Sequence, residues 1–165
     1  EEECGLIVHR GPCTLDIYGK TFFLAHGDGL GDPDKKFKFI KSIFHNKTCQ
    51  WLFRNLLPTN IGMKFGLNWA KRSRLKREGG KEPPYMGEHK EHLVLWTKEY
   101  MRTHSNIDYF IYGHRHIELD LNMPRENGHT ARMLILGDWI SQFTYAVFDG
   151  EHLFLEEYVE GESRP

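Results

Sequence analysis

The beginning of the chain has the hydrophobic pattern of two consecutive strands. Residues 14–18 (Thr-Leu-Asp-Ile-Tyr) alternate between polar and apolar side chains, which predicts a strand with one buried face. Residues 22–25 (Phe-Phe-Leu-Ala) are apolar throughout, which is typical of a strand buried on both faces. A turn is predicted between the two strands, at Gly19 and Lys20.

Helical spacing replaces this pattern after the second strand. Asp32 can cap a helix, and Pro33 suits its first position because the missing N–H group has no helical partner there. The apolar side chains of Phe37, Ile40 and Phe44 then recur at the spacing of one helix face. These residues predict a helix that begins at Asp32.

Two further helices are predicted before the chain returns to strands. The first runs from Asn46 through Leu57 and ends before Pro58. Residues 58–84 change from apolar to strongly basic and then to Gly and Pro, which predicts a short helix followed by a flexible loop. The pattern is helical again from Met86 to His104, with Leu93, Trp96 and Tyr100 on one face.

The last part of the chain predicts four strands. A strand at residues 110–112 runs into a loop, and three more lie within residues 131–139, 143–150 and 152–161, where Asp149-Gly150 is a strong hairpin signal. Strands, then helices, then strands favour a layered α/β or α+β domain with a helical insert at about residues 35–84. The length of 165 residues predicts a single domain over residues 1–165.

Composition narrows the functional classes. The net charge of −1 excludes a general electrostatic attraction to nucleic acid, and no nucleic-acid partner is expected. The three cysteines are far apart and lack a Cys-x-x-Cys spacing, which fits a reducing compartment. No apolar run approaches the ~20 residues of a membrane span.

Histidines follow two of the predicted strands. His26-Gly27-Asp28 comes after the strand at 22–25, and Gly-His-Arg-His (residues 113–116) after the strand at 110–112. Ligand sites of open α/β sheets lie at such strand ends. Imidazoles suit Mn²⁺, Fe²⁺ or Zn²⁺, although an ordinary surface turn with structural histidines would have the same residues.

Together, these two motifs resemble the C-terminal signatures of the calcineurin-like metallophosphoesterases. The closer resemblance is to the UDP-2,3-diacylglucosamine diphosphatases of lipid A biosynthesis. In that subgroup an acidic pair and an aromatic helix follow His-Gly-Asp, then come a helical insert, the Gly-His-x-His loop and a Leu-Gly-x-Trp element, here Leu136–Trp139. The resemblance implies a β-sandwich flanked by helices.

The site that this resemblance implies contains two metal ions, usually Mn²⁺, which activate a bridging hydroxide and bind the phosphate oxygens. By motif, His26 and His114 would bind one ion and His116 the other. His114 would also face the attacked phosphate and so be catalytic. Asp28 would orient the loop or a ligand histidine instead of binding metal.

Part of the family pattern is missing from this chain. The family also has an N-terminal Asp-x-His, a Gly-Asp that bridges the metals and a Gly-Asn-His/Arg-Asp, and none of these precedes His26. We therefore expect the chain to be the C-terminal half of such an enzyme. Metal binding and turnover by this chain alone should then be weak or absent. Exposed sheet edges would favour a homo-oligomer.

The predicted insert has two features that the resemblance connects with substrate. A basic run at residues 71–77 would by itself be a solvated helix face or loop. The resemblance implies instead that this region meets the diphosphate and sugar. The residues that it assigns to substrate binding are Asp34, Phe37, Ser73, Lys76 and Arg77.

The second feature is the apolar excess over residues 43–67. It predicts either an ordinary core between helices or a groove for fatty acyl chains. Beside the basic run, it could also seat the protein on an anionic membrane surface. The expected location is cytoplasmic and peripheral on the inner membrane.

The leading functional hypothesis is metal-dependent hydrolysis of UDP-2,3-diacylglucosamine to UMP and 2,3-diacylglucosamine 1-phosphate. A second hypothesis keeps the family and changes the substrate to another phosphodiester or a soluble nucleotide. A third, from another class, is a non-catalytic binding or interaction module in which the histidines are structural.

Overall fold

The chain forms two compact units, one of residues Glu1–Gly31 with Pro84–Pro165 and one of Asp32–Pro83. A computed structural model describes residues 5, 7–9, 11–31, 35–76, 84–125 and 128–160, without the side chains of residues 35–38, 41 and 73–76. The first unit contains the strands and the fourth helix. The second contains the first three helices.

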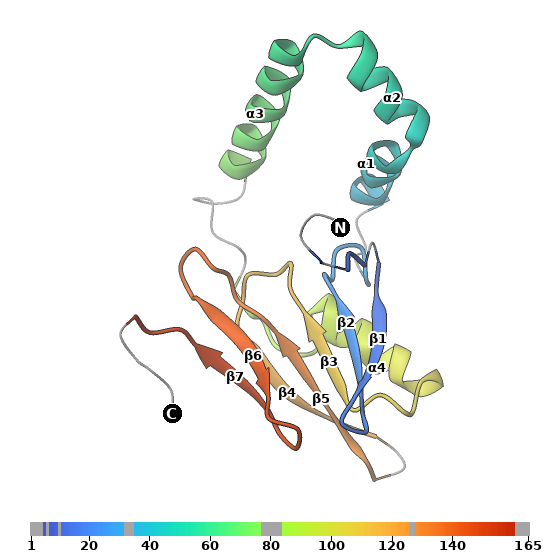
Figure 1. Cartoon of the computed structure of the whole chain (residues 1–165), viewed down its shortest axis with the longest axis vertical. Helices are drawn as coiled ribbons and strands as arrows, with labels where there is room; N and C mark the ends of the chain where they lie inside the picture. The colour runs from blue at the N-terminus through green and yellow to red at the C-terminus, as the bar shows by residue number, and fades with distance from the viewer. Residues whose placement is uncertain are drawn as a thin grey trace. The chain divides into compact units, whose positions relative to one another are not determined.

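A five-stranded mixed sheet is the centre of the first unit (Figure 1). Its strands are β1 (Cys13–Ile17), β2 (Lys20–Ala25), β3 (Tyr109–Tyr112), β4 (Leu119–Pro124) and β5 (Thr130–Ile135), in the order β1-β2-β3-β5-β4. The three central strands β2, β3 and β5 are parallel, whereas β1 and β4 pair antiparallel at the two sides. Parallel strands end on the same side of a sheet. We call the edge at Ala25, Tyr112 and Ile135 the carboxyl edge.

The chain closes with an antiparallel pair, β6 (Thr144–Phe148) and β7 (Leu153–Glu157). In the turn between them the Asp149 carboxylate accepts hydrogen bonds from the backbone N–H groups of Glu151 and His152, at 2.8 and 2.7 Å. Gly150 has a φ of +105°, which a side chain would disfavour. The hairpin predicted from Asp149-Gly150 is confirmed.

The two faces of the five-stranded sheet are covered by different layers. Helix α4 (His92–Thr103) lies on one face and the β6–β7 pair on the other (Figure 1). Phe23 is buried in the cluster beneath α4, and Phe22 is buried in the cluster with Leu153 of β7. The prediction that this strand is buried on both faces is therefore confirmed, as is the mixed α+β class of the fold.

Strand β4 is absent from the sequence-based prediction. Leu119, Leu121 and Met123 alternate with polar residues, and Met123 is fully buried, so the strand signal is present although short. Pro124 ends the strand at the side of the sheet, where a missing N–H group leaves no ladder bond unmade.

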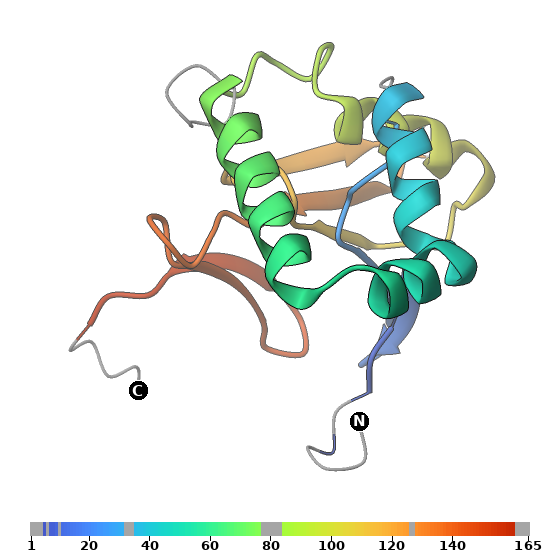
Figure 2. The same cartoon turned by 90° about the horizontal axis from the view of Figure 1, so that it is seen from above.

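The second unit consists of α1 (Lys35–His45), α2 (Lys47–Leu56) and α3 (Thr59–Lys76), which follow one another from cyan to green in Figure 2. The Asn46 side chain caps α2 by accepting hydrogen bonds from the backbone N–H groups of Thr48 and Cys49. The predicted start of this helix is thus confirmed. The proposed cap of the preceding helix, Asp32 with Pro33, lies outside the described residues.

Two predicted helix lengths are wrong. Residues 58–84 do not contain only a short helix, because α3 continues for 18 residues to Lys76. Lysine, arginine and leucine are good helix formers, and the basic run extends the helix instead of ending it. Conversely, α4 begins at His92 and not at Met86, because the N–H groups of Lys90 and Glu91 bond to the carbonyl of Gly87 in a separate turn.

The apolar side chains of the second unit remain largely exposed. In α2, which has no buried residue, Leu56 is 69% exposed, and in α3 Leu67 is 66% exposed. We call the following set the exposed apolar residues of α2 and α3: Trp51, Leu52, Phe53, Leu56, Ile61, Met63, Phe65, Leu67 and Trp69. Some of these side chains also contact one another across helices, as Phe44 of α1 and Trp69 of α3 do with ring centroids 6.1 Å apart, so the core and the acyl-groove alternatives both stay predictions.

Candidate active site at the carboxyl edge

Three loops begin side by side where β2, β3 and β5 end. The backbone N–H of Gly113 donates to the carbonyl of His26 at 3.1 Å, and the N–H of Leu136 donates to the carbonyl of Tyr112 at 2.7 Å. These bonds extend the parallel pairing one step beyond the strands. The His-Gly-Asp motif, the Gly-His-x-His motif and the Leu-Gly-x-Trp element therefore meet at one edge.

The rings of His26 and His114 lie next to each other. Their centroids are 5.1 Å apart and their planes make an angle of 72°. Both neighbouring glycines lie against this pair: a Cβ at Gly113 would be in ordinary contact with Nδ1 of His26 at 3.4 Å, and one at Gly27 with Cβ of His114 at 3.5 Å. Gly27 also has a φ of +102°, which glycine adopts without strain.

The Gly113–His116 segment, which we call the histidine loop, is unusually tight. His114 and His116 have φ angles of +68° and +46°, in the left-handed region that ordinary residues adopt at a cost. The N–H of Arg115 donates to the carbonyl of Gly113 at 2.8 Å. Non-glycine residues in such conformations cluster at functional sites.

The histidines alone do not form a complete metal site. Among residues 5, 7–9, 11–31, 35–76, 84–125 and 128–160, no three His, Cys, Asp or Glu side chains are close enough to hold an ion. His26 and His114 lie together, as a shared ion would require, while His116 is exposed further along the loop. Asp28 is half-buried in the turn that follows Gly27. The metal roles of His26, His114 and His116, and the orienting role of Asp28, stay predictions.

The predicted substrate-binding residues belong to the second unit or to its ends. Phe37 lies on α1, and Ser73 and Lys76 lie on α3, but their side chains are outside what the structure describes. Asp34 and Arg77 are outside the described residues altogether. Their roles also stay predictions.

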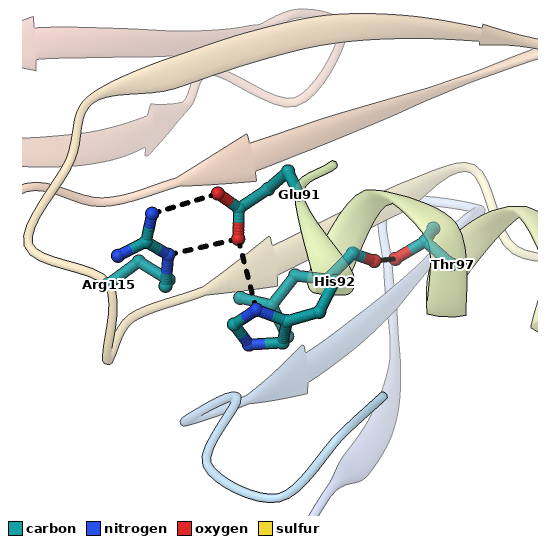
Figure 3. A network of polar contacts seen from close by, with 5 residues as sticks. Glu91, His92, Thr97 and Arg115 are labelled. Atoms are coloured by element: carbon teal, nitrogen blue, oxygen red, sulfur yellow. Dashed lines mark hydrogen bonds and ion pairs between the residues drawn. The ribbon is translucent and has the colours of Figure 1, made fainter. Parts of the chain in front are cut away.

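One ion pair at this edge was missed by the sequence analysis. The Arg115 guanidinium donates two hydrogen bonds to the Glu91 carboxylate, each of 2.9 Å, and Nδ1 of His92 lies 3.4 Å from the same carboxylate (Figure 3). The Glu91 side chain is only 3% exposed. Arg115 could have been noticed because it stands between two candidate ligands, but no sequence pattern points to Glu91.

A turn after β5 completes the edge. The Asp138 carboxylate accepts hydrogen bonds from the backbone N–H groups of Ser141, Ile140 and Gln142, at 2.6, 2.8 and 3.3 Å. These bonds favour the ionised carboxylate and lower the pKa of Asp138 to about 2. The Leu-Gly-x-Trp element is therefore held by its own aspartate.

This turn predicts a specific pH dependence of stability. Because the pKa of Asp138 is depressed on folding, its stabilising effect is complete above the ordinary pKa of about 3.9 and is lost as the pH falls through about 2. The thermal midpoint of Asp138→Asn should lie below that of the wild type above about pH 5. The difference should narrow toward pH 2, as thermal unfolding followed by circular dichroism can measure. A difference that stays constant over this range would contradict the prediction.

No protein-family model matches this chain, but several known proteins that share one name are similar to it in sequence. It is 33% identical to the UDP-2,3-diacylglucosamine hydrolase of Porphyromonas gingivalis over 94% of this chain and 61% of that protein. It is 24% identical to the protein of the same name from Edwardsiella ictaluri, over 94% of this chain and 58% of the relative. It is 29% identical to the protein of the same name from Psychromonas ingrahamii, over 81% of this chain and 51% of the relative.

These alignments confirm the relationship predicted from the two histidine motifs. The chain spans between about half and three fifths of the length of these relatives. Along 94% of its own length, this chain is similar to proteins named UDP-2,3-diacylglucosamine hydrolase.

Proposed function

We propose that the protein containing this chain hydrolyses the diphosphate bond of UDP-2,3-diacylglucosamine and releases UMP and 2,3-diacylglucosamine 1-phosphate. The observation that carries the proposal is the meeting of His26 and His114 at the carboxyl edge. It occurs in a chain that is similar over 94% of its length to a protein named for this substrate.

The proposed roles of the histidines follow from imidazole chemistry. Neutral nitrogens of His26 and His114 would bind one ion, and His116 would bind a second. When bound, Mn²⁺ supplies charge neutralisation at the phosphate and a more acidic water molecule. The described residues do not complete this ligand set, so the proposal requires further carboxylate ligands from outside the described residues.

The second unit supports a substrate with acyl chains. The exposed apolar residues of α2 and α3 are aromatic and aliphatic, and the basic residues Lys71 and Arg72 are exposed near the end of α3. Such a surface suits acyl chains next to phosphate groups, or the surface of an anionic membrane. We propose that the protein acts at the cytoplasmic face of the inner membrane. None of the helices that the structure describes is both long and apolar enough to cross a membrane.

The decisive experiment is an assay of the full-length protein with UDP-2,3-diacylglucosamine and Mn²⁺, with UMP release as the measurement. UMP release that requires Mn²⁺ is expected. Hydrolysis of simple phosphodiesters without activity on this lipid would instead favour a different metallophosphoesterase substrate. If elemental analysis finds no metal and no substrate is cleaved, the protein is a binding module and the proposal is wrong.

A further inference from the structure

The Arg115 side chain ties the histidine loop to α4. Arg115 lies between His114 and His116, yet its guanidinium turns to Glu91, at the position just before the helix (Figure 3). Both hydrogen bonds are 2.9 Å long and use two different nitrogens and both carboxylate oxygens. This bidentate geometry fixes the orientation of both planar groups.

The burial of this pair makes it sensitive to substitution. The side chains of Glu91 and Arg115 are 3% and 11% exposed. A buried charge needs its partner, because removal of one member leaves the other desolvated and unpaired. Glu91 makes no side-chain cap bond to α4 although it occupies the N-cap position. Its carboxylate is directed to the histidine loop instead.

A second contact holds the other side of the loop to the same helix. The hydroxyl of Thr97 donates to the carbonyl of Leu93 at 2.7 Å, so it accepts the hydrogen bond from the Tyr112 hydroxyl at 2.8 Å. Thr97 and Tyr112 are both fully buried. Because Tyr112 is the last residue of β3, the two contacts with α4 enclose Gly113 and His114 between them.

The loop that follows His26 also approaches α4. A Cβ at Gly31 would lie 2.6 Å from the carbonyl oxygen of His92 and 2.8 Å from Cβ of Trp96. This distance is possible only because Gly31 has no side chain. The first turns of α4 therefore contact both loops that carry the facing histidines.

We propose that Glu91 and Arg115 are positioning residues, which hold the histidine loop in the left-handed conformation that directs His114 toward His26. Backbone conformations of this kind persist where the surrounding structure enforces them, and the ion pair supplies such a restraint between the two left-handed histidines. The proposal rests on the proposed function, because its catalytic consequence requires the His26–His114 pair to act on substrate.

The experiment uses the full-length protein with Glu91→Gln, Arg115→Lys and the double variant Glu91→Gln/Arg115→Met. The double variant removes both charges, so it avoids an unpaired buried charge if the single variants fold poorly. The matched control is Asp120→Asn, which breaks a second bidentate pair, between Asp120 and Arg132 on β4 and β5. Amide hydrogen exchange of residues 113–118 measures the loop without substrate, and kcat and KM measure the reaction.

We expect exchange in the histidine loop to become about ten-fold faster or more in the Glu91 and Arg115 variants. Exchange in α4 and the central strands should be unchanged in the double variant. In the same variants kcat should fall by about 10- to 100-fold, as for other residues that orient ligand side chains. KM should change little, because the residues predicted to bind substrate belong to other segments of the chain. The control should show neither effect.

Two results would overturn the proposal: wild-type loop exchange in the double variant, or a loss of kcat that only parallels faster exchange of the whole domain. If the wild-type protein releases no UMP, the proposed function fails. The exchange of the loop then still decides whether Glu91 and Arg115 position it.

Discussion

Replacement of His114 by alanine in the full-length protein is expected to reduce the kcat for UMP release by about 10²- to 10⁴-fold, the range for loss of a group that acts on the reacting atoms. The reason is the double role proposed for this residue, which would bind a metal ion with His26 and also face the phosphate. The ring centroids of His114 and His26 are 5.1 Å apart. No other described imidazole ring has a contact of this kind with His26 that could replace it.

The matched control for His114→Ala is His152→Ala. His152 is exposed in the turn between β6 and β7. Its replacement should leave kcat within about two-fold of the wild-type value, as is usual for surface substitutions. Mn²⁺ affinity, measured by electron paramagnetic resonance titration, should fall in His114→Ala and stay unchanged in the control. If His114→Ala keeps more than a tenth of the wild-type kcat, the catalytic role of this histidine is wrong.

A second large effect is expected on stability. Replacement of Phe23 by alanine should lower the free energy of unfolding by about 3–5 kcal/mol. Phe23 is 4% exposed, and its ring centroid lies 5.1 Å from that of Tyr100 and 5.7 Å from those of Trp96 and Phe110. It therefore joins α4 to the sheet three residues before His26. The free energy of unfolding of a domain is only about 5–15 kcal/mol, so this variant should be near the limit of folding.

Urea unfolding of the full-length protein can measure this effect, with Phe154→Ala as the control. Phe154 is also a strand phenylalanine, but it is 43% exposed on β7, so its removal should cost less than about 1 kcal/mol. Equal losses in the two variants would show that the contact between α4 and the sheet does not carry the stability assigned to it.

The local features of this protein were predictable from its sequence, because they depend on neighbouring residues. Asn46 begins α2 through bonds to N–H groups two and three residues ahead. Asp149 and Gly150 form the hairpin turn in the same local way. The apolar run at residues 22–25 predicted a doubly buried strand, since any strand without a polar face must be covered on both sides.

Elements in which two local signals compete were harder to predict from sequence. The charge of the basic run at the end of α3 favours a loop, whereas the helix propensity of its residues favours a helix. In β4 three apolar positions alternate correctly, yet the strand is short and ends in proline. Six residues contain too little pattern to separate a strand at the side of a sheet from a loop.

By itself, the sequence determined which side chains could perform chemistry at this site: histidines after two strands, each with a glycine that permits a sharp turn. Only the tertiary structure decided which of them meet. The contact of His26 with His114 requires β2 and β3 to be parallel neighbours, and the Glu91–Arg115 pair joins residues 24 positions apart. Such contacts depend on strand order and on burial against α4, which are properties of the whole packed domain and not of any short segment.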